Sequence, residues 1–86
     1  MTTKNEAGLY PFAQTATEAE VNSKLFQGAC SVGKYGPASR AQIDYLAALM
    51  VRNDASRAIF QDFVCNTSGS LPVKKAARLI EKLLAI

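Results

Sequence analysis

Apolar residues recur every three or four positions through most of this 86-residue chain, and this spacing constrains its fold more than any other feature. The clearest run is Ile43, Leu46, Ala47 and Met50, which returns to one face of a helix at each turn. No segment alternates apolar and polar residues for long enough to predict a sheet, and no internal repeat is present. We therefore predict an all-α fold, a small bundle of about four short helices.

Capping signals set the expected boundaries of the first two helices. Thr17-Glu18-Ala19-Glu20 is a capping box, and Gly28 favours a left-handed stop, so we expect a helix over about 18–27. Its apolar stripe is formed by Val21, Leu25 and Phe26. Ser39-Arg40-Ala41-Gln42 repeats the capping pattern and predicts a second helix, which ends at about Arg52.

Two further helices are expected in the second half of the chain. Asn53 and Asp54 are favourable N-cap residues for a helix over about 55–65. Ser70 is predicted to cap the last helix, with Pro72 in its first turn, where the missing N–H costs nothing. The glycines and prolines between residues 29 and 38 predict an open loop, and residues 66–70 predict a second one.

The first 16 residues are predicted to form an extended N-terminal arm. Its apolar cluster, Leu9-Tyr10-Pro11-Phe12, contains a proline that disfavours a helix through it. Tyr10 and Phe12 either fold back over the helices as a lid or dock on a partner. Residues 17–86 are expected to form one helical domain, because the chain is too short for two independent cores.

The positive charge is concentrated in the C-terminal part of the chain. The net charge is +3, and residues 31–86 hold eight basic residues against four acidic ones. Lys74, Lys75, Arg78 and Lys82 fall on one side of the last predicted helix and form a basic stripe. Such a stripe is either a solvated helix face or a surface that contacts nucleic acid or an acidic protein.

The sequence predicts no catalytic residue, cofactor site or metal site, and therefore no enzyme. Histidine is absent, so neither Cys30 nor Cys65 has a histidine base or a histidine co-ligand for zinc. The stretch from Gly28 to Lys34 spells G-x-x-x-x-G-K, but Tyr35 follows where a phosphate-binding loop needs a hydroxyl residue for magnesium. We interpret this stretch as an interhelical loop.

The cysteines and the N-terminus suggest a location inside the cell. The start of the chain lacks the features of a signal peptide, and no apolar run reaches the ~20 residues that span a bilayer. We therefore expect a cytoplasmic protein without membrane contact. In that compartment Cys30 and Cys65 are expected to be reduced and half-buried, with a bridge between them as the less favoured alternative.

The predicted helices carry more large apolar residues than a domain of this size hides. Tyr45, Phe60 and Phe63 are the candidate apolar anchors for a partner protein, with the basic stripe as their polar rim. The same surplus predicts a homodimer.

The second half of the chain resembles a small helical module of phage and mobile-element proteins. The resemblance is carried by Ser39-x-x-Gln42-x-x-Tyr45-x-x-x-Leu49, then Leu71, Lys-Lys-Ala-Ala and Leu79-Ile80-x-x-Leu83. It implies a phage or mobile-element source, in which compact chains without active sites clamp onto host or defence proteins, as anti-CRISPR proteins do. The expected function is therefore inhibition or remodelling of a host or defence protein or ribonucleoprotein. The alternative is a DNA- or RNA-binding accessory protein that uses the basic stripe.

Overall fold

A computed structural model describes residues 8–32, 36–65 and 70–86. These residues hold five helices and no strand: α1 (Pro11–Thr15), α2 (Glu18–Cys30), α3 (Arg40–Met50), α4 (Asp54–Cys65) and α5 (Val73–Leu84). The all-α fold is thus confirmed. The predicted count of four helices is too low by one, since α1 was not expected.

The additional helix, α1, occupies the segment that was predicted to be an extended arm. Pro11 is its first residue, where the fixed φ of proline suits a helix and its missing N–H is not needed. Leu9, Ala13 and Ala16 are buried, so this segment packs on the other helices. The prediction of an extended arm is therefore wrong for residues 11–15, which are helical, whereas residues 1–7 lie outside the described residues.

Helices α2 and α3 begin where their capping boxes place them. At α2 the Thr17 hydroxyl accepts from the backbone N–H of Glu20, and the Glu20 side chain accepts from the backbone N–H of Thr17. At α3 Ser39 and Gln42 make the same two hydrogen bonds. The expected end of α2 is wrong, however, because the helix continues through Gly28 to Cys30. Gly28 is buried inside the helix, and its carbonyl oxygen accepts from the N–H of Leu71, so it joins α2 to the segment before α5.

Helix α4 is capped as expected, but α5 is not. The Asn53 side chain accepts from the backbone N–H of Ser56 at 2.9 Å and so satisfies one of the free donors at the start of α4. At α5 the N-cap residue is Pro72, which makes no side-chain cap, whereas Ser70 was predicted. The start of α5 is held by backbone pairing and not by a side-chain cap. Pro37 and Pro72 lie opposite each other in an isolated antiparallel β-bridge.

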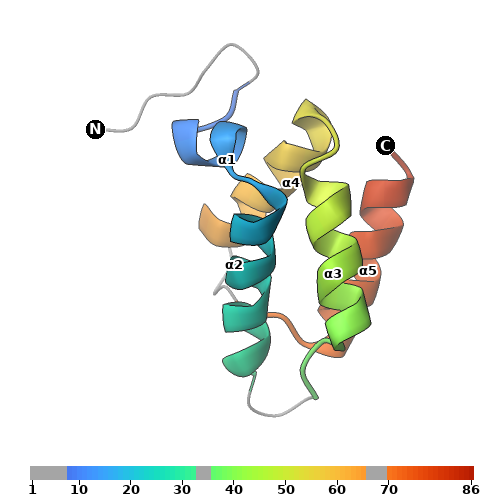
Figure 1. The fold of residues 1–86 in the computed structure, drawn as a ribbon. Coiled ribbons are helices and arrows are strands. Elements are labelled where there is room, and N and C mark those ends of the chain that lie inside the picture. Colours follow the sequence, from blue (N-terminus) through green and yellow to red (C-terminus); the bar gives the residue numbers. More distant parts are fainter. Residues whose placement is uncertain (1–7, 33–35, 66–69) are drawn as a thin grey trace.

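Helices α3 and α5 run parallel, with α2 antiparallel to α3 and α4 crossing behind (Figure 1). At the lower end, the N–H of Ala38 donates to the carbonyl oxygen of Leu71 at 3.1 Å, and the N–H of Val73 donates to that of Gly36 at 3.0 Å. At the upper end, the Arg52 guanidinium donates to the carbonyl oxygen of Leu83. Helix α5 is therefore fixed beside α3 at both ends.

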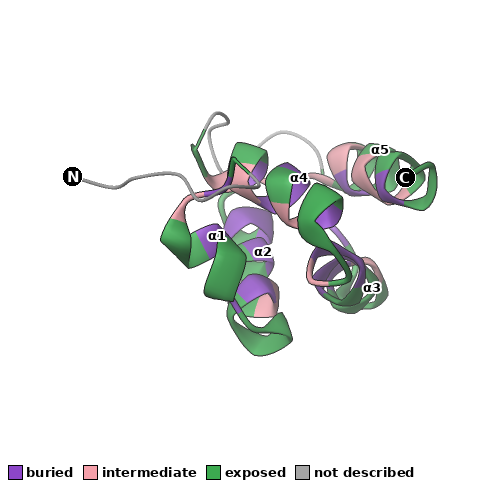
Figure 2. Cartoon of the chain, turned by 90° about the horizontal axis from the view of Figure 1, so that it is seen from above, coloured by how far each residue is buried: buried purple, intermediate pink, exposed green. Residues whose placement is uncertain are grey.

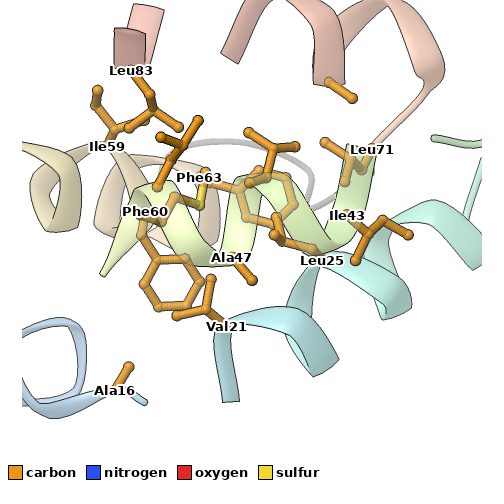
Figure 3. Packing of buried hydrophobic residues seen from close by; sticks show 14 of the residues in the cluster. Ala16, Val21, Leu25, Ile43, Ala47, Ile59, Phe60, Phe63, Leu71 and Leu83 are labelled. Atoms are coloured by element: carbon orange, nitrogen blue, oxygen red, sulfur yellow. The ribbon is translucent and has the colours of Figure 1, made fainter. Parts of the chain in front are cut away.

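The hydrophobic core lies where α2, α3, α4 and α5 converge, and α1 closes one end of it. Phe60 and Phe63 of α4 and Val21 and Leu25 of α2 belong to this buried cluster, which Figure 3 shows from close by. Seen from above, α5 lies at the rim of the molecule, with exposed and intermediate residues on its outer side (Figure 2). Among the described residues, no helix is long and apolar enough to cross a membrane.

Candidate binding surface

Three of the four predicted basic residues lie on the solvent-facing side of α5. Lys74, Arg78 and Lys82 are exposed and follow one another at four-residue intervals, so they form a row along the helix. We call these three residues the cationic row. Glu81 lies next to it and is also exposed.

The fourth basic residue, Lys75, faces α4. Its Nζ lies 5.1 Å from the centre of the Phe63 ring, within the range of a cation–π contact. Burial lowers the pKa of Lys75, and the nearby carboxylate of Asp62 partly opposes this effect. The basic stripe of the sequence is thus divided, because Lys75 is half-buried between helices while the other three residues reach solvent.

Only one of the three predicted apolar anchors is exposed. Tyr45 on α3 is 46% exposed, whereas Phe60 and Phe63 are 0% and 2% exposed. The Phe60 ring lies 5.9 Å from that of Phe12, so α1 helps to cover it. The prediction that Phe60 and Phe63 are surface anchors is therefore wrong for this conformation, since both belong to the core.

The structure exposes other apolar side chains in their place. Val73 and Leu84 on α5 and Ile86 after it are exposed. Phe26, which was expected to be in the buried stripe of α2, is 46% exposed, and the Arg40 guanidinium lies 5.7 Å from its ring centre. The one sequence signal for such side chains was the general surplus of large apolar residues in the predicted helices, and it did not single out Val73.

Two arginines stabilise the fold through hydrogen bonds to backbone carbonyl oxygens. Arg52 binds the end of α5, and Arg57 donates to the carbonyl oxygens of Ala13 and Ala16. Both therefore contribute less to an external binding surface than the net charge suggests.

One hollow of about 230 Å³ lies between α2 and α4. Its lining consists of Lys24, Gln27, Gly28, Ser31, Phe63 and Val64. Lys24 is the one charged side chain in this lining, so the hollow does not gather the groups that a catalytic site needs.

The sequence analysis interpreted the stretch from Gly28 to Lys34 as an interhelical loop and not as a phosphate-binding loop. The first residues of this stretch belong to the end of α2. Gly28 is inside that helix, and α2 precedes the motif where a phosphate-binding loop has a strand. Gly33, Lys34 and Tyr35 lie outside the described residues. Within the parts of the chain that are described, no three His, Cys, Asp or Glu residues gather to form a metal site.

Both cysteines are free and exposed, on α2 and α4 respectively. The expectation that Cys30 and Cys65 are half-buried is therefore wrong. Each is the last residue of its helix. The alternative of a bridge between them is not formed in this structure.

No protein-family model, curated protein or solved structure matches this chain.

Proposed function

We propose that this chain is a non-catalytic binding protein that inhibits or remodels a larger protein or ribonucleoprotein assembly by occupying a surface on it. The observation that supports the proposal is the cationic row, three exposed basic side chains on a helix at the rim of the molecule. Exposed cations on a helix attract an acidic surface and orient the complex during association. Tyr45 on the neighbouring helix supplies the exposed aromatic contact.

The composition of α5 favours a protein partner over nucleic acid. Glu81 places a carboxylate beside the cationic row, and a carboxylate repels the phosphates of a nucleic-acid backbone. In addition, α5 contains no Asn, Gln, Ser or Thr, which are side chains that read base edges. A mixed-charge protein surface is the better complement.

The resemblance of residues 39–83 to modules of phage and mobile-element proteins supports a host or defence protein as the target. In this proposal the chain blocks the target sterically, and the target supplies any chemistry. The cytoplasm of the host cell is the proposed place of action.

The proposal is tested by affinity capture from a nuclease-treated lysate of the native host. Three forms are compared as bait: the wild-type protein, the Arg78→Glu/Lys82→Glu variant, and Lys24→Glu, which reverses an exposed charge on α2. We expect a host protein that is enriched by wild type and by Lys24→Glu but not by the double variant. With that protein purified, the double variant should bind about tenfold more weakly or worse, since each lost charge contact contributes roughly 1 kcal/mol.

A parallel titration with single- and double-stranded oligonucleotides separates the alternative function. Micromolar binding with a steep salt dependence that is lost in Arg78→Glu/Lys82→Glu would replace the protein-binding proposal with a nucleic-acid one. Capture that is equal for all three baits would overturn the role of the cationic row.

A further inference from the structure

An apolar edge runs along α5 beside the cationic row. It consists of Val73, Ala77, Ile80 and Leu84, spaced by four, three and four residues. Val73 is 40% exposed and Leu84 is 54% exposed, and Ala77 is exposed between them. Ile80 packs against the core at the inner border. This alternating spacing is that of the d and a positions in a helix that pairs with another helix.

The apolar edge faces the α3 side of α5. Ala76 and Leu83 form the buried face of α5, Lys75 borders that face on the side of α4, and the other border, with Ile80, therefore lies on the side of α3, the second neighbour of α5 in Figure 2. Arg52, just after α3, reaches the carbonyl oxygen of Leu83 along the same border. Tyr45, two turns before Arg52, is exposed on α3. Tyr45 is thus an exposed aromatic side chain on the helix that packs beside α5.

The charges that flank the apolar edge are self-complementary. Lys74 and Glu81 each follow an edge residue directly, at the e positions of this repeat, and lie seven residues apart. Along α5, the point midway between Lys74 and Glu81 lies close to the point midway between the first and the last residue of the apolar edge. When such a helix pairs with a reversed copy of itself, each lysine therefore meets the glutamate of the other copy.

We propose that a second copy of this chain covers the apolar edge through antiparallel pairing of α5 with α5. In this arrangement Val73 packs against Leu84 of the second copy and Ala77 against its Ile80. Lys74 and Glu81 form two symmetry-related ion pairs across the interface. The arrangement is isologous, so the same patch serves both copies and the assembly closes at two.

A second copy suits this edge better than an acidic helix of another protein. Glu81 lies on the flank where such a helix would place its own carboxylates, and like charges there oppose binding. Arg78 and Lys82 lie farther around the helix than Lys74 and Glu81, away from the apolar edge. They therefore stay accessible in the pair, and their repulsion across the interface is screened by solvent.

Charge reversal across the interface tests the pairing directly. We expect the wild-type protein to form dimers in sedimentation equilibrium. Lys74→Glu and Glu81→Lys should each weaken self-association by about tenfold or more, because two attractive pairs become two repulsive ones. An equimolar mixture of these two variants should recover wild-type affinity, since the mixed dimer holds two attractive pairs, one with the wild-type polarity and one with the polarity reversed. Arg78→Glu is the matched control and should dimerise like wild type.

Two outcomes would overturn the proposal. One is a wild-type protein that stays monomeric at millimolar concentration. The other is a mixture of Lys74→Glu and Glu81→Lys that associates no better than either variant alone. Circular dichroism checks that each variant is folded, as expected for exposed positions, so that lost association reports on the interface.

Discussion

The Nη2 atom of Arg52 lies 2.9 Å from the carbonyl oxygen of Leu83 and donates a hydrogen bond from the end of α3 to the last turn of α5. The last carbonyls of a helix lack partners within the helix and form the negative end of its dipole. A guanidinium is therefore a favourable partner for them. Together with the bond from Ala38 to Leu71, this contact holds the two parallel helices together at both ends.

Replacement of Arg52 should loosen the C-terminal end of α5. We expect Arg52→Ala to lower the free energy of unfolding by about 1 kcal/mol, because a hydrogen bond to a charged group contributes about 1.5–3 kcal/mol and solvent at the exposed Arg52 screens part of it. Urea unfolding measures the change, and hydrogen exchange of residues 83–86 should accelerate. Arg78→Ala removes the same group from an exposed site on α5 and should change stability by less than about 0.5 kcal/mol. Equal effects would contradict the structural role of Arg52.

Arg57 joins three segments, and its loss should cost more. Its Nη1 donates to the carbonyl oxygens of Ala13 and Ala16 at 3.1 and 2.9 Å, and its Nη2 donates to that of Val51 at 3.4 Å. We expect Arg57→Ala to lower the free energy of unfolding by about 2 kcal/mol and to expose residues 10–16 to proteolysis. Arg57→Lys should recover less than half of the loss, because an ammonium lacks the planar fork that reaches several acceptors. Full recovery by lysine would show that charge alone is sufficient.

The parts of the fold that could be predicted from the sequence are those fixed by local chemistry. The starts of α2 and α3 depend on capping boxes that lie within four consecutive residues, Thr17–Glu20 and Ser39–Gln42. By contrast, α1 has five residues and is too short to be stable alone. Contacts from far along the chain stabilise it, since Arg57, more than 40 residues away, donates to the carbonyl oxygens of Ala13 in α1 and of Ala16 just after it. No local pattern reports such a contact.

The candidate surface was predicted only in part, for a similar reason. The basic residues of α5 could be placed on one side of a helix from their spacing alone. Which large apolar residues are buried depends instead on how α4 is turned toward its neighbours. Phe60, Phe63 and Tyr45 all fit the apolar pattern of their helices, and the tertiary packing buries the first two, with Phe12 of α1 against Phe60 and Lys75 of α5 over Phe63. Helical periodicity does not distinguish these cases.

A comparison of two aromatic truncations tests this assignment. Phe60→Ala should lower the free energy of unfolding by about 3–5 kcal/mol, because it leaves a cavity in the core. Tyr45→Ala should lower it by less than about 1 kcal/mol, since nearly half of that side chain is already exposed. Thermal unfolding of both variants provides the measurement. Similar costs for the two would mean that Tyr45 is part of the core.

The partial burial of Lys75 should make stability depend on pH in the alkaline range. Because burial lowers its pKa from the ordinary 10.5 in the folded protein, the unfolded chain binds more protons at any pH between the lowered pKa and 10.5. The contribution of Lys75 to the free energy of unfolding therefore rises as pH rises through that window.

Lys75→Met keeps the aliphatic contact with Phe63 and removes the titration. We expect the stability of wild type minus that of Lys75→Met, measured by urea unfolding at successive pH values, to increase toward pH 10.5. Lys24→Met, at an exposed site on α2, controls for the general loss of a lysine. A difference that is constant or falls with pH would contradict a lowered pKa at Lys75.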